Sequence, residues 1–170
     1  MLIIFGGLPG TDKSTIARLL ALSLNSVWLR IDSIEQSLVQ SEKITISDMG
    51  PAGYVVAYAI AADNIRLGNT VIADSVNHLA ITRQSWRNVA LENAVPALEI
   101  EIICSNKAQH QERVEPRLAD IPGHVLPDWQ KVINRQYEDW LSTDLTLDTS
   151  ALTPEQAVEV IPQHIKSRRR

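Results

Sequence analysis

Residues 6–15 read GGLPGTDKST, a glycine-rich turn that ends in a lysine and two hydroxyl side chains. Main-chain N–H groups in such a turn point at phosphate oxygens, and the lysine and hydroxyl that follow suit the outer phosphates and Mg²⁺. The pattern predicts that Lys13 contacts phosphate and that Ser14 holds the metal ion. A turn that carries a lysine by chance is the simpler alternative, but the preceding apolar strand and the spacing favour phosphate binding. The residues predicted to contact a nucleotide are Gly7, Leu8, Pro9, Gly10, Thr11, Asp12, Lys13, Ser14, Thr15 and, from a later segment, Arg113.

One residue departs from this pattern, because Asp12 stands where the second glycine is expected. A carboxylate about 4 Å from a phosphate charge would cost on the order of 4 kcal/mol at an effective dielectric near 20. That cost corresponds to roughly a thousandfold in affinity. The side chain avoids it by pointing to solvent, since aspartate tolerates unusual backbone dihedrals. Alternatively it pairs with Lys13 or with a distant arginine, which would stabilise the empty loop and compete with nucleotide. The sequence leaves both possibilities open.

Two further acids end predicted strands, in the segments SVWLRID and TVIADS. Open α/β sheets bind ligands beyond the carboxyl ends of their strands, so these acids are expected beside the glycine-rich turn. Asp74 is placed to steady Mg²⁺ together with Ser14. Asp32 is placed to accept a proton from a substrate hydroxyl. Arg30, two residues earlier on the same strand face, is expected either to pair with Asp32 or to bind substrate. Capping of the next helix is the simpler alternative for each acid.

A later segment, QERVEPRLADIPGHVLPDWQKVINRQYEDW, carries Arg113, Arg117 and Arg135, with a loop rich in proline and glycine between them, and these arginines are candidates for a functional role. Phosphoryl transfer calls for mobile cations that close over the developing charge and exclude water. Arg113 and Arg117 are predicted to supply that charge, and they share a helix face if the helix reaches that far. Neutralisation by the adjacent glutamates is the alternative. His78 is predicted to contact substrate, whereas His124 is interpreted as a polar loop residue.

Composition and charge limit the possible functions. The chain has 170 residues, 45% of them hydrophobic, which predicts a single domain spanning residues 1–170. The formal net charge of −4 argues against general nucleic-acid binding. The basic run at residues 167–170 is interpreted as a solvated terminus. Since no apolar stretch approaches membrane-spanning length, a soluble cytoplasmic protein is expected.

The elements that must position these residues alternate between strand and helix. This alternation favours a parallel sheet covered by helices on both faces. We predict strands at 2–5, 26–32, 70–75, 97–104 and 145–149, and helices at 14–24, 33–39, 54–67, 81–93, 106–118, 128–141 and from 153 onward.

Taken together, GGLPGTDKST, RIDSIE, VIADS and RVEPRLADIPGHVLPDW resemble the small phosphate-loop kinases, and most closely the bacterial AAA-type ATPase/kinase family. Gluconate kinase, adenylylsulfate kinase, chloramphenicol phosphotransferase and zeta-toxin kinases are similar at a greater distance. The resemblance implies an α/β fold of three layers with a five-stranded parallel sheet in the order 2-3-1-4-5, ATP and Mg²⁺ as donor, and a small lid at residues 112–127. It also implies that Asp32 is the base or substrate anchor and that Arg113 and Arg117 are lid arginines. Asp12 departs from the family pattern.

The leading hypothesis is therefore an ATP-dependent kinase that phosphorylates a hydroxyl of a small molecule. The second is a nucleotide-binding regulatory module with weak or no turnover, because Asp12 replaces the glycine. A kinase acting on nucleic-acid 5′-hydroxyl ends is a third possibility, which the net negative charge disfavours. Substrate specificity is expected to reside at residues 41–54 and at Asn77 and His78.

Overall fold

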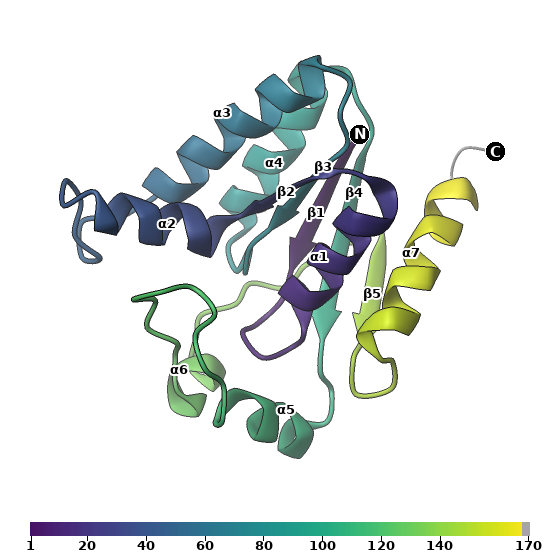
Figure 1. The fold of residues 1–170 in the computed structure, drawn as a ribbon. Coiled ribbons are helices and arrows are strands. Elements are labelled where there is room, and N and C mark those ends of the chain that lie inside the picture. Colours follow the sequence, from purple (N-terminus) through teal and green to yellow (C-terminus); the bar gives the residue numbers. More distant parts are fainter. Residues whose placement is uncertain (168–170) are drawn as a thin grey trace.

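The sheet has the predicted order. The structure, a computed structural model, describes residues 1–167, so the terminal arginines of the basic run lie outside the described residues. The strands pair in parallel in the order β2-β3-β1-β4-β5 (Figure 1), as expected for a phosphate-loop kinase. Their bounds are β1 Leu2–Gly6, β2 Val27–Arg30, β3 Val71–Asp74, β4 Ala97–Ile103 and β5 Leu145–Asp148.

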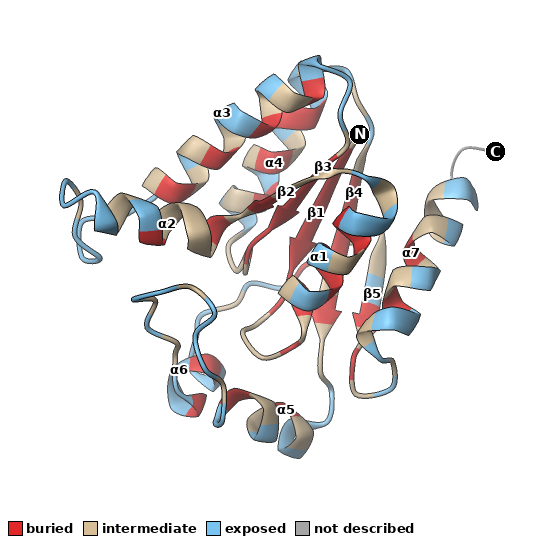
Figure 2. Cartoon of the chain, viewed as in Figure 1, coloured by how far each residue is buried: buried red, intermediate tan, exposed pale blue. Residues whose placement is uncertain are grey.

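Helices cover both faces of the sheet, which gives three layers (Figure 1). Side chains of β1 alternate between the two faces: Leu2 and Ile4 pack with residues of α3 and α4, whereas Ile3 and Phe5 pack with residues of α1 and α7. The central strands β1 and β3 are fully buried between these layers and β4 is mostly buried, whereas the edge strands β2 and β5 are partly exposed (Figure 2). The helices are α1 Lys13–Leu24, α2 Ile31–Gln40, α3 Ala52–Arg66, α4 Ala80–Glu92, α5 Lys107–Val114, α6 Trp129–Ile133 and α7 Pro154–Ser167.

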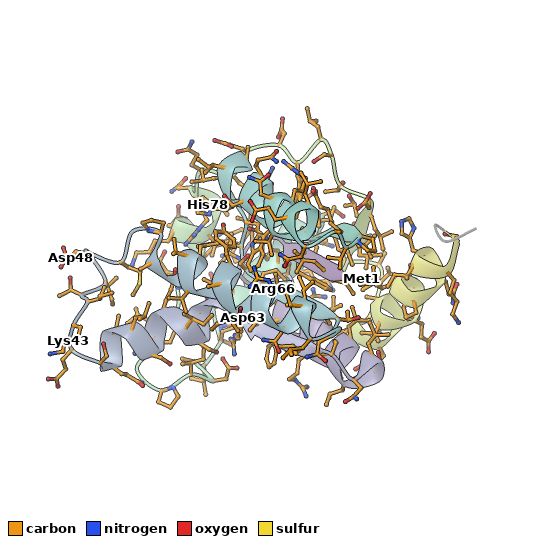
Figure 3. All side chains as sticks on the ribbon, turned by 90° about the horizontal axis from the view of Figure 1, so that it is seen from above. Met1, Lys43, Asp48, Asp63, Arg66 and His78 are labelled. Atoms are coloured by element: carbon orange, nitrogen blue, oxygen red, sulfur yellow. The ribbon has the colours of Figure 1, made fainter. Side chains whose placement is uncertain are left out.

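All five strands end at the same edge of the sheet, beside the glycine-rich turn, α5 and α6 (Figure 1). Helices α2 and α3 pack against each other. The loop that joins them carries Lys43 and Asp48 and projects away from the sheet (Figure 3). None of the helices within residues 1–167 has the length and apolar character needed to cross a bilayer.

The second strand is shorter than predicted. It ends at Arg30, and Ile31 already begins α2, so Asp32 lies in the first turn of a helix rather than at the end of a strand. A negative charge in that turn is favourable, because the unpaired N–H groups of the helix start carry partial positive charge. The prediction that Arg30 and Asp32 share a strand face is therefore wrong.

Two predicted helices are also shorter than expected. Helix α5 ends at Val114, shortly before Pro116, which lacks the N–H that would continue the helix. Arg113 is thus helical and Arg117 is not, so the two do not share a helix face. Helix α6 stops at Ile133, well short of the predicted end at residue 141.

Tertiary contacts explain why residues 134–144 leave the helical path. The guanidinium of Arg83 donates hydrogen bonds to the carbonyl oxygens of Glu138 and Asp139, which would otherwise belong to helical turns. It also donates to the carbonyl oxygen of Asn77, after β3. The indole of Trp140 packs on Gly6 and donates to the Glu99 carboxylate at 2.5 Å. These contacts hold residues 134–144 against the edge of the sheet, and we call this segment the strap.

Candidate active site

The conformation of the glycine-rich turn after β1 is fixed by a glycine backbone angle and by local hydrogen bonds. Gly7 has a φ of 142°, and a Cβ there would collide with the carbonyl oxygen of Ile102. The Gly7 N–H donates to the Val76 carbonyl at 3.0 Å, and the Thr11 hydroxyl donates to the Leu8 carbonyl at 2.8 Å. Only a residue without a side chain fits at Gly7, so the sequence of the turn sets its shape.

Three side chains meet at the end of β3. The Lys13 ammonium lies 2.6 Å from Asp74 Oδ1, with the two side chains 8% and 0% exposed. The Ser14 hydroxyl donates to the same carboxylate oxygen at 3.1 Å, and the Trp28 indole N–H donates to Oδ2 at 3.2 Å. The buried carboxylate of Asp74 is therefore fully compensated within the protein.

The prediction that Asp74 and Ser14 hold Mg²⁺ can be tested against this geometry. Their oxygens are already close enough to be adjacent ligands of one cation. No cluster of three His, Cys, Asp or Glu side chains suited to a metal ion occurs among residues 1–167. Mg²⁺ at nucleotide sites is commonly held by one or two protein groups together with phosphates and waters, so a hydroxyl and a carboxylate fit this ion.

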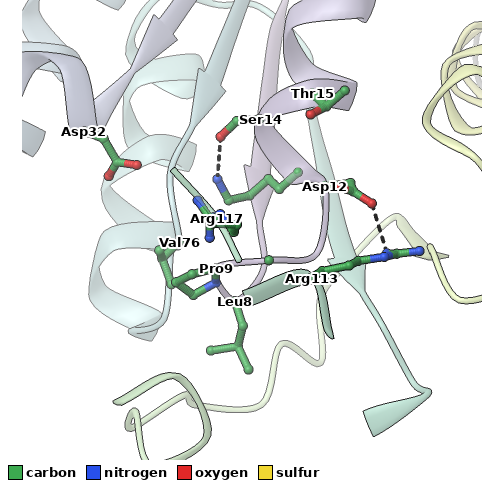
Figure 4. Close-up of a pocket in the computed structure, with 11 residues that line it drawn as sticks. Leu8, Pro9, Asp12, Ser14, Thr15, Asp32, Val76, Arg113 and Arg117 are labelled. Atoms are coloured by element: carbon green, nitrogen blue, oxygen red, sulfur yellow. Dashed lines mark hydrogen bonds and ion pairs between the residues drawn. The ribbon is translucent and has the colours of Figure 1, made fainter. Parts of the chain in front are cut away.

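Asp12 adopts the left-handed backbone conformation that glycine would normally supply, with φ 63° and ψ 11°. Its carboxylate forms an ion pair with the Arg113 guanidinium at 2.9 Å (Figure 4). Arg113 also donates to the hydroxyl and the carbonyl oxygen of Thr149, each at 2.9 Å. Of the alternatives open from the sequence, Asp12 thus takes the pairing with a distant arginine rather than with Lys13.

A pocket of about 270 Å³ lies over the turn (Figure 4). We call it the donor pocket. All of its lining residues except Val76 were predicted as site residues, and the predicted ones come from the turn, the start of α1, α2, α5 and the loop after α5. The pocket is lined by Leu8, Pro9, Gly10, Asp12, Lys13, Ser14, Thr15, Asp32, Val76, Arg113 and Arg117.

A second pocket, of about 360 Å³, adjoins the first. We call it the acceptor pocket. Asp32 and Arg117 line both pockets, as do Pro9 and Val76. The remaining lining residues come from α2, α3 and the segment that passes over the edge of the sheet: Ile31, Glu35, Gly50, Tyr54, His78, His124, Val125, Leu126, Pro127, Lys131 and Arg135.

Several polar groups of the acceptor pocket have unusual surroundings. Burial raises the pKa of Glu35 to about 7, and the nearby Asp32 adds to this rise. Burial lowers the pKa of His78, and the positive charges of Arg135 and Arg83 lower it further. The Nη1 atom of Arg117 and the Nδ1 atom of His78 are buried without a hydrogen-bond partner among the described residues. Such atoms are rare in folded proteins unless a ligand or water completes them.

Other predicted site residues lie elsewhere. Arg30 donates two hydrogen bonds to the Asp120 carboxylate, at 2.6 and 2.9 Å, and lines neither pocket. This bidentate pair ties the end of β2 to the loop between α5 and α6, and it holds the pKa of Asp120 below its usual range. His124, interpreted from the sequence as a polar loop residue, lines the acceptor pocket.

Sequence reasoning missed Glu35 and Lys131 as residues of the site. Glu35 follows Asp32 by three positions, so helical spacing could have placed both on one face of α2. Nothing in the sequence singled out Lys131, which lies on the short helix α6. Arg135, named with Arg113 and Arg117 in the arginine-bearing segment, lines the acceptor pocket, but it lies beyond the end of α6 rather than on the long helix predicted at 128–141.

Comparison with known proteins agrees with this geometry. A family model described as an AAA domain matches residues 2–135. No curated protein matches the chain. Among solved structures, a candidate kinase from Chloroflexus aurantiacus is 22% identical, with a TM-score of 0.76 over 98% of this chain and 96% of that one. An APS kinase from Mycobacterium tuberculosis in complex with AMPPNP and APS is 21% identical, with a TM-score of 0.71 over 97% and 96%.

A gluconokinase from Sinorhizobium meliloti is 17% identical, with a TM-score of 0.65 over 97% of this chain and 91% of that one. At these identities the structures establish a shared fold and no shared substrate. The family match covers most of the chain, including the glycine-rich turn, both acids and both arginines. The chain therefore belongs to the AAA domain family, and its fold is that of the small phosphate-loop kinases.

Proposed function

We propose that this chain is an ATP-dependent phosphotransferase that moves the γ-phosphoryl group to a hydroxyl of a small molecule. The observation that carries the proposal is that the donor and acceptor pockets meet at Asp32 and Arg117. A nucleotide on the glycine-rich turn and an acceptor in the second pocket would approach each other at these two side chains. Such positioning supplies much of the rate enhancement in phosphoryl transfer.

In the proposed reaction the acceptor hydroxyl oxygen attacks the γ-phosphorus. A new P–O bond forms, the bond to the β-phosphate oxygen breaks, and ADP leaves. Asp32 takes the proton of the hydroxyl, and Arg117 stabilises the charge of the phosphoryl group in transfer. Lys13 exchanges the Asp74 carboxylate for the outer phosphates. Mg²⁺, when held by Ser14 and Asp74, would neutralise charge on the phosphate oxygens.

Arg113 has a different position from Arg117. It is held by Asp12 and Thr149, and we propose that it contacts the nucleotide from the side of the turn. For Arg113 to reach the phosphates, its ion pair with Asp12 has to open. This requirement supports the second candidate function, a regulatory module that binds nucleotide with weak or no turnover.

A transfer assay tests the proposal. The protein is incubated with ATP, Mg²⁺ and a panel of sugars, sugar acids, nucleosides and aminoglycoside or chloramphenicol-type antibiotics, and products are identified by mass spectrometry. We expect a product 80 mass units heavier than one class of acceptor, within about 1 unit, together with acceptor-dependent release of ADP. Nucleotide binding without product or hydrolysis would favour the regulatory module. Undiminished ATP hydrolysis without any phosphorylated acceptor would refute transfer to a small molecule.

A further inference from the structure

The acceptor pocket contains more positive charge than its own acids balance. Arg117, Lys131 and Arg135 face two carboxyl groups, those of Asp32 and Glu35. Burial raises the pKa of Glu35 to about 7, so near neutral pH this side chain carries only part of a negative charge and balances only part of the excess. An occupant without charge would leave the excess unbalanced.

The cations are also poorly paired within the described part of the chain. Neither Arg117 nor Arg135 makes an ion pair there, and Arg117 Nη1 is buried with no hydrogen-bond partner. Lys131 has only a loose contact of 3.6 Å with Asp128, and both side chains are largely exposed. Arg135 lies within electrostatic reach of Glu35 and His78, because its charge lowers the pKa of both. These positive charges are therefore available to a ligand.

The cations differ in which pocket they line. Arg117 lines both pockets and is positioned for the phosphoryl group in transfer. Lys131 and Arg135 line only the acceptor pocket and do not border the donor pocket. A group that binds to them would occupy the part of the acceptor that does not react, while the reacting hydroxyl lies at Asp32.

We infer that the acceptor carries an oxyanion group, a carboxylate or a phosphate, which binds to Arg135 and Lys131 while its hydroxyl lies at Asp32. This inference rests on the proposed function and specifies its substrate class. Arginine matches the two oxygens of such a group with parallel N–H donors, whereas a neutral polyol offers no charge to pair with it. Because its pKa is lowered, His78 stays neutral, and it is a partner for hydroxyl groups of the acceptor that lie between the oxyanion and the reacting hydroxyl.

Calorimetry with matched ligands tests the inference. The donor pocket is first filled with Mg²⁺ and a non-hydrolysable ATP analogue, so that anions cannot bind to the glycine-rich turn. Three probes of one carbon skeleton follow: sorbitol, gluconate and sorbitol 6-phosphate. We expect at least one anionic probe to bind roughly tenfold more tightly than sorbitol, the effect of one charge-assisted hydrogen bond. The better of the two distinguishes a carboxylate from a phosphate, and added salt should weaken the preference.

Variants connect the preference to the named residues. Arg135→Gln should reduce the preference for the anionic probe to less than threefold, and Lys131→Gln should reduce it by a smaller factor, because Lys131 is more exposed and already contacts Asp128. Lys166→Gln, near the end of α7, is the matched control and should leave it unchanged. All three positions are exposed, so the variants are expected to fold.

The outcomes separate this inference from the proposed function. Three results would each overturn the inference. All three probes bind equally, or the preference survives in the double variant of Lys131 and Arg135. In the third, no probe binds at 10 mM, which limits the binding free energy to about 3 kcal/mol. In those cases the analogue still binds the donor pocket, and the proposed transfer reaction stands on its own assay. Failure of the analogue itself to bind would count against the proposed function.

Discussion

The donor and acceptor pockets adjoin each other, yet they satisfy their charged groups in opposite ways. In the donor pocket, Lys13 pairs with Asp74 and Arg113 pairs with Asp12, both within 2.9 Å. In the acceptor pocket, Arg135 has no ion pair within residues 1–167, and buried nitrogen atoms of Arg117 and His78 have no hydrogen-bond partner there. Apart from Asp32 and Arg117, which line both pockets, the charged groups of the donor pocket are paired without a ligand, whereas Arg135 of the acceptor pocket is not.

This difference has a physical consequence for binding. A ligand of the donor pocket must replace existing ion pairs, so part of its interaction energy is spent in opening them. A ligand of the acceptor pocket instead supplies partners that the protein lacks, and each such hydrogen bond adds to affinity. We therefore expect donor affinity to be limited by internal pairing, and acceptor selectivity to be set by the unpaired groups.

The largest effect is expected for Lys13→Ala, which breaks the internal pairing of the donor pocket. Phosphoryl transfer should fall at least about a hundredfold, because the cation for the outer phosphates is lost. The buried Asp74 would also lose its counter-ion, which should lower the free energy of unfolding by about 3 kcal/mol. Transfer kinetics and urea unfolding measure the two effects. Lys43→Ala is the control, and transfer within tenfold of the unchanged protein would contradict the prediction.

Asp32→Asn tests the boundary between the two pockets. We expect kcat to fall about a hundredfold, because the side chain can no longer accept the hydroxyl proton. Nucleotide affinity should stay within about threefold, since the phosphate contacts lie on the turn. Steady-state kinetics and titration with an ATP analogue separate these quantities. Asp63→Asn on α3, where Asp63 is 74% exposed and pairs only with Arg66 (Figure 3), is the matched control. A loss of affinity with unchanged kcat would show that Asp32 has another role.

Asp12→Gly and Asp12→Asn test the internal pairing of the donor pocket, because both remove the ion pair between Asp12 and Arg113. Both remove the negative charge, and both residues tolerate the left-handed conformation found at this position. We expect ATP analogues to bind roughly tenfold more tightly, less than the effect of an unpaired carboxylate, because Arg113 already balances part of the charge. Calorimetry measures the change, with Asp48→Asn as control. Unchanged affinity in both variants would mean that the ion pair does not compete with nucleotide.

The smallest effect is expected for Glu35→Gln in the acceptor pocket. Burial raises the pKa of Glu35 from 4.5 to about 7, so this group stabilises the fold at low pH, and its contribution is lost as pH rises through 7. Glutamine does not ionise and should raise Tm by about 2 °C at pH 8, with no gain at pH 5. The effect is small because solvent still reaches Glu35. Thermal unfolding at both pH values measures it, and Glu92→Gln on the exposed end of α4 should show no such difference.

Local features of the sequence were sufficient for much of the fold. The apolar run of β1, the glycines of the turn and the threonine that caps α7 are short-range signals, and each formed as predicted. Thr153 accepts a hydrogen bond from the Gln156 N–H, as its spacing indicated. The sheet order was expected from the resemblance to phosphate-loop kinases and is confirmed.

Element ends were predicted less well, because tertiary contacts decide them. Residues 134–141 were predicted to be helical, yet Arg83 binds the carbonyl oxygens of Glu138 and Asp139, and Trp140 is buried against the sheet. The strap that results brings Arg135 to the acceptor pocket. Helix propensity differs between residues by only a few tenths of a kcal/mol, which is less than such tertiary contacts contribute.

The sequence by itself determined the glycine-rich turn, the alternation of strands and helices, and the presence of acids and arginines near one edge of the sheet. Only the tertiary structure decided which charges pair. Asp12 and Arg113 are far apart in the chain, as are Arg30 and Asp120, and each arginine had more than one acid within its predicted neighbourhood. A sequence specifies which charges exist, whereas ion pairing depends on distances of a few ångströms, which the packing of distant segments alone sets.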